Sequence, residues 1–229
     1  MKLLFLNYEY PPIGGGASTA TEAILKAWRE DPEVEVHLIT SGVGHRYEKV
    51  SLGWSVFVHR MPIGKDIAKL HSQSIRDILV YTWRVWRFSR TFIREETRKQ
   101  PFDATLAFFT VPCGFLAYLI GRRFGIPFVV SLRGADVPGF SEKYDMFYLF
   151  AKPLVRFLWR RARVVIPNSA GIRALAEQTS PGQPMRIIEN GVDTVTFAPD
   201  NGEKPASPVI YLSTSRLTPR KGIHFLIEA

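Results

Sequence analysis

The stretch KLLFLNYEYPPIGGGASTATEAILKAW (2–28) places an apolar run, a glycine loop and an amphipathic segment in immediate succession. The run KLLFLN (2–7) has the length and the continuous apolar character of a strand that is buried on both faces. Thr19 and Glu22 have the spacing of a capping box, so we expect the first helix to open there. A buried strand that feeds a helix through a glycine loop is typical of a Rossmann-like α/β domain.

The same alternation continues through most of the chain. Further strands are predicted over 34–40, 54–60, 104–109, 128–132, 163–168 and 186–190. Helices are predicted over 72–99, 113–124, 144–161 and 169–178, the first of them from apolar residues that repeat every three and four positions. Strands that alternate with helices indicate a doubly wound parallel sheet, so the predicted class is α/β.

The composition changes at TFAPDNGEKPASP (196–208), which is rich in proline, glycine and charge and is typical of a linker. A predicted strand over 209–215, a loop and the opening of a helix at 223–229 follow. One strand and part of a helix cannot bury a core of their own. We therefore interpret 1–195 as one domain and 209–229 as the truncated beginning of a second.

The overall composition is that of a globular protein, with 46% hydrophobic and 22% charged residues. The single cysteine excludes an internal disulfide framework and a cysteine-based zinc site. No run reaches the roughly 18 apolar residues of a membrane span. These features predict a cytoplasmic chain, and the formal net charge of +9 indicates a polyanionic partner or surface.

The first candidate site is the loop that contains Gly14, Gly15 and Gly16. Without Cβ atoms the backbone can adopt positive φ and approach a ligand closely. The helix that follows offers free N–H groups and a partial positive charge, which suit a phosphate group. The loop has neither the G-x-G-x-x-G nor the Walker spacing, and a tight turn without a ligand is the alternative.

The second candidate is the pair Arg216 and Lys221, within SRLTPRKG (215–222). Thr218 could cap a helix with Pro219 in its first position. Lys221 would then lie in the first turn, where a cation opposes the helix dipole, and a bound diphosphate would compensate for that cost. A solvated basic turn is the alternative.

Two further candidates follow predicted strands. Arg133, Gly134 and Asp136 come after the strand at 128–132, and Asn190 and Gly191 end the strand at 186–190. Asp136 could accept a hydroxyl proton or bind a sugar, and Arg133 could hold an anion. The alternatives are an Arg–Asp pair that orders the loop and a tight Asn-Gly turn.

These features, in this order, resemble the family-4 glycosyltransferases of the GT-B fold, in which two Rossmann-like domains face each other. The resemblance rests on the glycine loop, on ENGVD (189–193) followed by Phe197 and Pro199, and on SRLTPRKG. It implies a retaining transfer of a sugar from a nucleotide-diphosphate sugar to a hydroxyl of a glycan or lipid-linked acceptor. It also implies that the positions of Arg216 and Lys221 hold the donor diphosphate, that the glycine loop lies near donor phosphate and acceptor, and that no metal or other cofactor is needed.

The chain departs from that family in two respects. Arg133 stands where the family often has histidine, and the resemblance implies that the family's Glu-x7-Glu pair, which contacts the donor sugar and nucleotide, lies beyond residue 229. The resemblance therefore implies that the chain holds the acceptor-side domain and only the start of the donor-binding domain. We expect such a fragment to be inactive without the rest of the parent enzyme.

Two basic clusters account for much of the positive charge. They comprise Arg84, Arg87, Arg90, Arg94 and Arg98 on the long predicted helix, and Lys152, Arg156, Arg160, Arg161 and Arg163 near the fourth predicted helix. Such patches suit an anionic membrane surface on the cytoplasmic side, and a solvated helix face is the alternative. We expect Trp83, Trp86 and Phe92 to pack inside the protein rather than to anchor lipid.

Two other functions are weighed against glycosyl transfer. An NAD-dependent dehydrogenase or sugar epimerase would need G-x-G-x-x-G and an acid at the end of the second strand, where Thr40, Ser41 and Gly42 stand instead. A basic module that binds nucleic acid or a membrane without catalysis should carry aromatic platforms on an exposed sheet. The predicted strands are of the buried type, so we expect no nucleic-acid partner.

Overall fold

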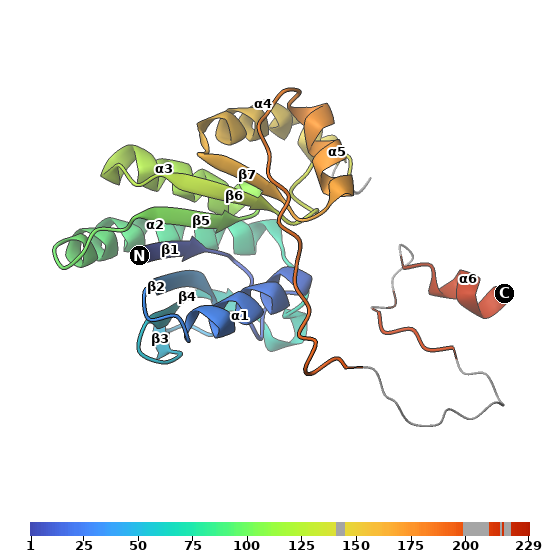
Figure 1. Cartoon of the computed structure of the whole chain (residues 1–229), viewed down its shortest axis with the longest axis horizontal. Coiled ribbons are helices and arrows are strands. Elements are labelled where there is room, and N and C mark those ends of the chain that lie inside the picture. Colours follow the sequence, from blue (N-terminus) through green and yellow to red (C-terminus); the bar gives the residue numbers. More distant parts are fainter. Residues whose placement is uncertain (141–144, 199–210, 216, 218–220) are drawn as a thin grey trace. The chain divides into compact units, whose positions relative to one another are not determined.

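The computed structural model of the chain describes residues 1–140, 145–198, 211–215, 217 and 221–229. These residues divide into two units, Met1–Asn190 and Gly191–Ala229. The first unit contains a seven-stranded sheet with helices on both of its faces (Figure 1). The second unit contains the helix α6, Ile223–Glu228.

The sheet has the strand order β3-β4-β2-β1-β5-β6-β7. Every neighbouring pair is parallel except β3 and β4, which are antiparallel. The strands are β1 (Lys2–Leu6), β2 (Glu35–Val43), β3 (Glu48–Ser51), β4 (Val56–Lys65), β5 (Ala104–Phe108), β6 (Phe128–Leu132) and β7 (Val164–Pro167). This doubly wound arrangement confirms the predicted α/β, Rossmann-like class.

The helices of the first unit connect these strands. They are α1 (Gly16–Trp28), α2 (Ile75–Thr97), α3 (Phe115–Phe124), α4 (Asp145–Arg161) and α5 (Ala170–Thr179), with short turns η1 (Ile67–Lys69) and η2 (Thr110–Gly114). No helix in the described part of the chain is both long enough and apolar enough to span a bilayer.

Alternation along the central strand divides the core into two layers. Leu4 and Leu6 of β1 pack with side chains of α2, α3 and α4, including the fully buried Tyr81 and Trp159. Leu3 and Phe5 point to the opposite face and pack with Leu25 and other side chains of α1. Both faces of the sheet are therefore covered, which explains why the predicted strands read as continuous apolar runs.

Two helix starts differ from the sequence analysis. The helix α1 begins at Gly16 with Gly15 as its N-cap, so the prediction that Thr19 caps it was wrong; the Thr19 hydroxyl instead donates to the Gly15 carbonyl at 3.4 Å. The helix α2 begins with a capping box that the sequence analysis missed. There the Ser74 side chain accepts from the Asp77 N–H, and the Asp77 carboxylate accepts from the Ser74 N–H.

Three strand predictions also need correction. The edge strand β3 was missed because its sequence, EKVS, is polar and exposed. Residues 186–190 form no strand, although the N–H groups of Arg186 and Ile188 donate to carbonyls of β7 at 3.1 Å. Residues 211–215 have no strand structure, since no neighbouring strand is available among the described residues of their unit; 209 and 210 lie outside the described residues.

Candidate functional site

The strand order reverses direction at β1 and β5, because the chain first builds the sheet towards β3 and then returns to build it towards β7. In open α/β sheets, ligands bind beyond the carboxyl ends of the strands at such a switch point. Three of the four predicted candidates belong to this edge: the glycine loop follows β1, the Arg133 loop follows β6, and Asn190 contacts Arg133. The loop after β5 contacts the Arg133 loop through Thr110 and Asp136. We therefore call this region the carboxyl-edge site.

The glycine loop after β1 is held from two sides. The Gly14 N–H donates to the Leu70 carbonyl at 3.0 Å, and the Gly14 carbonyl accepts from His71 Nδ1 at 2.7 Å. The Gly15 N–H donates to Glu9 Oε2 at 3.3 Å. The loop is thus fixed against Glu9 and against the segment that precedes α2.

The need for glycine differs among the three positions. Gly14 has φ +108°, and a Cβ there would lie 2.7 Å from Glu9 Cβ, so this position requires glycine. Gly15 has φ −143°, which corrects our expectation of positive φ at that residue. A Cβ on Gly15 or Gly16 would meet nothing within 4 Å, so the space beside these residues is open.

Asn7 and Glu9 form a part of this edge that the sequence analysis missed. The buried Asn7 Nδ2 donates to the Glu9 carbonyl at 2.5 Å and to Thr21 Oγ1 at 2.7 Å, while Asn7 Oδ1 accepts from the Glu9 N–H at 3.1 Å. These contacts orient the backbone that carries the Glu9 carboxylate. Polar residues directly after the first strand were the available signal.

Asp136 is buried in the loop after β6. Its Oδ1 accepts from the N–H groups of Arg133 (2.8 Å) and Gly134 (3.1 Å), and its Oδ2 accepts from the N–H (2.9 Å) and hydroxyl (3.2 Å) of Thr110. Burial raises the pKa of Asp136, and these donors oppose that rise. The two carboxylate oxygens thus join the loop of Thr110 to the loop of Arg133, which fits a residue that positions other groups. The predicted role of Asp136 as a proton acceptor stays a prediction.

The loop after β5 approaches the same carboxylate through an unusual backbone conformation. Phe109 has φ +69°, which is uncommon for a residue with a bulky side chain. It directly precedes Thr110, whose hydroxyl also accepts from Trp159 Nε1 at 2.9 Å. Strained backbone of this kind concentrates at ligand sites.

Arg133 extends a cation over this edge. Its guanidinium lies 3.4 Å from the centre of the Phe108 ring, and Nη1 donates to Asn190 Oδ1 at 2.6 Å. Its buried Nε has no hydrogen-bond partner among the described residues. Burial lowers the pKa of Arg133 to about 10, so the group stays charged at neutral pH and offers an unused donor. The structure thus joins two predicted residues, Arg133 and Asn190, that are 57 positions apart.

The remaining predicted residues have varied placements. Gly134 has φ +108°, and a Cβ there would come within 2.8 Å of the Phe140 ring, so it requires glycine. A Cβ on Gly191, in the second unit, would meet nothing within 4 Å. Arg216, like Thr218 and Pro219, lies outside the described residues. Lys221 lies two positions before α6, which begins at Ile223; its expected place in a helical turn that starts at Thr218 and Pro219 stays a prediction, because those two residues are not described.

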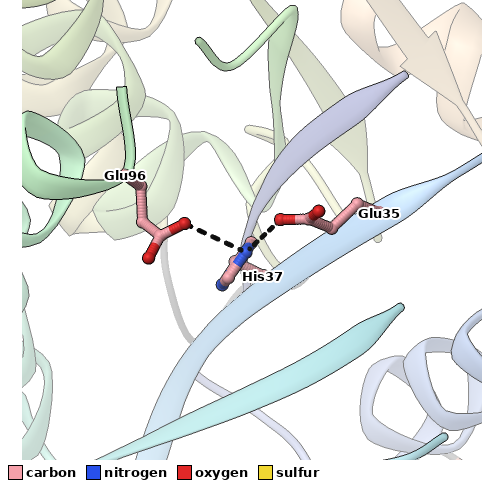
Figure 2. Close-up of side chains that lie close together, drawn as sticks. All are labelled: Glu35, His37 and Glu96. Carbon is pink, nitrogen blue, oxygen red and sulfur yellow. Dashed lines mark hydrogen bonds and ion pairs between the residues drawn. The ribbon is translucent and has the colours of Figure 1, made fainter. Parts of the chain in front are cut away.

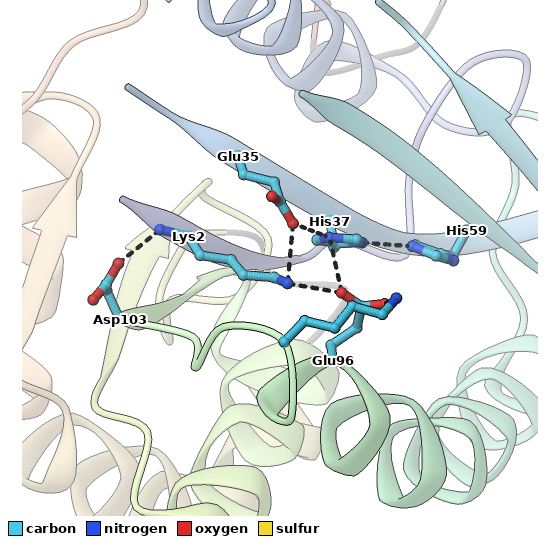
Figure 3. Close-up of polar contacts among 7 residues, drawn as sticks. Lys2, Glu35, His37, His59, Glu96 and Asp103 are labelled. Carbon is cyan, nitrogen blue, oxygen red and sulfur yellow. Dashed lines mark hydrogen bonds and ion pairs between the residues drawn. The ribbon is translucent and has the colours of Figure 1, made fainter. Parts of the chain in front are cut away.

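A second polar cluster lies at the amino ends of β1 and β2, the opposite edge of the sheet. Figure 2 shows Glu35, His37 and Glu96, whose ligand atoms lie within 4.8 Å of one another; in the described part of the chain this is the group that could hold a metal ion. Figure 3 shows why a metal fits poorly there, since the buried Lys2 Nζ reaches Glu35 at 3.0 Å and Glu96 at 2.7 Å. The lysine already compensates both carboxylates.

The histidines of this cluster continue into a chain of hydrogen bonds. His37 Nε2 lies 2.8 Å from Glu35 Oε1, His37 Nδ1 lies 3.0 Å from His59 Nε2, and His59 Nδ1 lies 2.8 Å from the Tyr47 hydroxyl. One neutral tautomer of each ring satisfies all three contacts. Burial lowers the pKa of His59 to about 3 and also lowers that of His37. The two histidines are therefore neutral, and the cluster is a structural network at the edge opposite the carboxyl-edge site.

Comparison with known proteins identifies the family of this fold. The model of the glycosyl transferase 4-like domain matches residues 15–191, which include Gly15 and Gly16 of the glycine loop, Arg133, Asp136 and Asn190. The chain belongs to this family. The family assignment confirms the resemblance seen in the sequence and disfavours the dehydrogenase and epimerase alternatives.

Individual relatives agree with this assignment. The Escherichia coli (strain K12) protein WcaL, named for glycosyl transfer in colanic acid biosynthesis, is 35% identical over 80 residues, which are 34% of this chain and 19% of WcaL. Sucrose-phosphate synthase from Thermosynechococcus elongatus superposes with a TM-score of 0.67 at 15% identity, over 100% of this chain and 59% of that one. Trehalose-6-phosphate synthase OtsA gives 0.53 at 11% identity, over 90% and 53%. These structures show a shared GT-B fold, and the chain spans little more than half of each.

Proposed function

We propose that a protein carrying this chain transfers a sugar, with retention, from a nucleotide-diphosphate sugar to a hydroxyl of a glycan or lipid-linked acceptor. The observation that carries the proposal is the carboxyl-edge site within a glycosyl transferase 4-like domain. Solved structures with the same fold include Phytolacca americana UGT2 complexed with UDP-2-fluoro-glucose and pterostilbene. The acceptor then lies on the domain that this chain supplies.

The chemistry requires stabilisation of the leaving diphosphate. Negative charge develops on that group as the glycosidic bond breaks, and fixed cations and N–H groups lower the barrier without a metal ion. The open space beside Gly15 and Gly16, at the N-terminus of α1, suits an anion. Arg133 adds a charged group, which is held beside this edge by the Phe108 ring and Asn190. Arg216 and Lys221 would hold the diphosphate from the donor side.

Asp136 has a supporting part in this proposal. Its carboxylate ties the Thr110 loop to the Arg133 loop, so it positions Arg133. Asn190 fixes the other end of the guanidinium. The side chains that contact substrate are then Arg133 and the residues around the glycine loop, including Glu9.

We further propose that the protein acts at the cytoplasmic face of an anionic membrane, through α4. Met146, Leu149 and Phe150 are 80%, 73% and 79% exposed on this helix. Lys152, Arg160 and Arg161 supply nearby positive charge, which is worth about 1 kcal/mol per residue near an anionic leaflet. Arg156 is excluded from this role because its Nε donates to the Thr179 carbonyl.

The proposed transfer is tested with the whole protein that contains this chain. Purified protein is incubated with a panel of nucleotide-diphosphate sugars and membrane or glycan acceptors, with and without a metal chelator. We expect a glycoside with the anomeric configuration of the donor, formed equally well with chelator. Transfer with inverted configuration would contradict retention, loss of transfer with chelator would contradict metal independence, and no transfer from any donor would contradict the function.

A further inference from the structure

Three adjoining hollows run along α2; two of them also border β4 and the loop after β2, and the third is lined by α2 side chains alone. The largest, of about 430 Å³, has aromatic and apolar walls that include Tyr47, Trp83 and Phe88. A hollow of about 230 Å³ adjoins it through the shared residues His45 and Arg84. A third, of about 240 Å³, adjoins it through Arg87. We call these hollows together the α2 groove.

The α2 groove carries positive charge along its whole length. Its lining includes five arginines and no acidic residue: Arg76, Arg84, Arg87, Arg90 and Arg94. None of these guanidinium groups forms a salt bridge within the described residues. Between Arg76 and Arg94 the helix rises about 27 Å. The groove therefore suits an extended molecule with several anionic groups.

Aromatic side chains provide flat apolar surfaces between these charges. Trp83 is 59% exposed and Tyr47 is 46% exposed, which corrects our expectation that Trp83 is packed inside. Tyr47 is held in place by the His59 contact and by the Phe88 ring at 5.4 Å. Exposed aromatic rings of this kind stack on the apolar faces of sugar rings, while arginine forks bind carboxylates or phosphates.

The α2 groove also connects with the carboxyl-edge site. Arg76 lies in the first turn of α2, and the segment just before this helix contains Leu70 and His71. Both of these residues bind the backbone of Gly14. A chain lying in the groove would thus approach the glycine loop at one end.

From this juxtaposition we propose that the α2 groove binds an acidic oligosaccharide, the part of a growing acceptor chain that precedes its reacting end. This inference rests on the proposed function and specifies its acceptor class. The exposed aromatic surfaces between the arginines favour a sugar chain over a bilayer, and the absence of acidic residues from the lining favours an anionic chain over a neutral one. The groove would then hold the acceptor while its terminal hydroxyl reaches the carboxyl-edge site.

Binding is tested on the chain of residues 1–229 by calorimetric titration. The probes are a galacturonic acid hexasaccharide and a neutral glucose hexasaccharide. We expect the acidic chain to bind and the neutral one not to bind. Arg84→Gln/Arg87→Gln should weaken binding at least about tenfold through lost charge-assisted hydrogen bonds. Arg122→Gln/Arg123→Gln, an equal loss of charge on exposed residues of α3, should change affinity less than about twofold.

Trp83→Ala separates groove binding from general attraction to positive charge, since it leaves the charge unchanged. We expect it to weaken binding several-fold with the same salt dependence, and circular dichroism should show a retained fold. Three results would overturn the inference. They are equal weakening of binding by the two arginine double substitutions, unchanged binding by Trp83→Ala, and binding only to phosphatidylglycerol vesicles or duplex DNA. The binding assay does not depend on sugar transfer. Transfer by the whole protein without oligosaccharide binding would refute only the proposed binding in the α2 groove, and oligosaccharide binding without transfer would refute only the proposed function.

Discussion

Gly14→Ala is expected to destabilise the first unit much more than Gly15→Ala, although the two glycines are adjacent. Gly14 has φ +108°, and a Cβ there would lie 2.7 Å from both Glu9 Cβ and Glu9 Oε2. A non-glycine residue in such a conformation costs about 1–3 kcal/mol. Displacement of Glu9 would also break its hydrogen bond with the Gly15 N–H, which contributes about 1 kcal/mol. The expected loss in the free energy of unfolding is thus about 2–4 kcal/mol.

Gly15→Ala is the matched control. Its Cβ would meet nothing within 4 Å, and its φ of −143° is not positive. As the N-cap of α1 it should lose less than about 1 kcal/mol on substitution by alanine. Urea unfolding followed by circular dichroism measures both variants, and a thermal melt should show a decrease of about 4–16 °C for Gly14→Ala. Equal stabilities of the two variants would refute the assignment of strain to Gly14.

Two further predictions concern the opposite edge of the sheet and the loop after β6. Burial lowers the pKa of His59 to about 3 in the folded state. As the pH is lowered from 6.5 to 5, the unfolded state therefore binds a proton that the folded state does not, and the free energy of unfolding decreases by about 2 kcal/mol. His59→Phe should reduce the dependence of the free energy of unfolding on pH, measured by urea unfolding at several pH values. An unchanged dependence would contradict the conclusion that His59 is neutral in the folded state. Asp136→Asn should lose about 1–3 kcal/mol of stability at pH 7, because its amide group would face N–H donors now bound by a carboxylate; wild-type stability would show that these contacts do not order the loops.

The order of the elements could be predicted from the sequence because burial on both faces leaves continuous apolar runs. Strand β1 follows this rule. Helix α2 has one buried stripe, whose residues repeat every four positions from Asp77 to Ile93. Strand β3 could not be predicted in this way, because an edge strand needs only one partner and its EKVS sequence is polar. The run at 186–190 was wrongly predicted as a strand: the N–H groups of Arg186 and Ile188 donate to carbonyls of β7, but no strand forms there.

The candidate site was predictable only in part. The glycine loop and the Arg133 loop are local patterns that follow strands, so their position at the carboxyl edge could be inferred. Other contacts could not be inferred from local patterns. Gly14 with His71 and Asp136 with Thr110 are pairs distant in sequence, and the contact of Gly14 with Glu9 depends on the backbone conformation of the loop. The positive φ therefore fell on Gly14 rather than Gly15, a distinction that three consecutive glycines do not reveal.

The most direct test of the proposed site measures initial rates of sugar transfer by the whole protein with Gly15→Val and with Arg122→Gln/Arg123→Gln. The valine side chain would fill open space beside the proposed phosphate position, so transfer should fall by about 100-fold, the scale of one lost oxyanion contact. Arg122 and Arg123 are exposed in the last turn of α3, which leads into the amino end of β6, so Arg122→Gln/Arg123→Gln should transfer at nearly the wild-type rate at pH 7.5. Wild-type transfer by Gly15→Val, measured on protein with an unchanged thermal melt, would contradict the assignment of sugar transfer to the carboxyl-edge site.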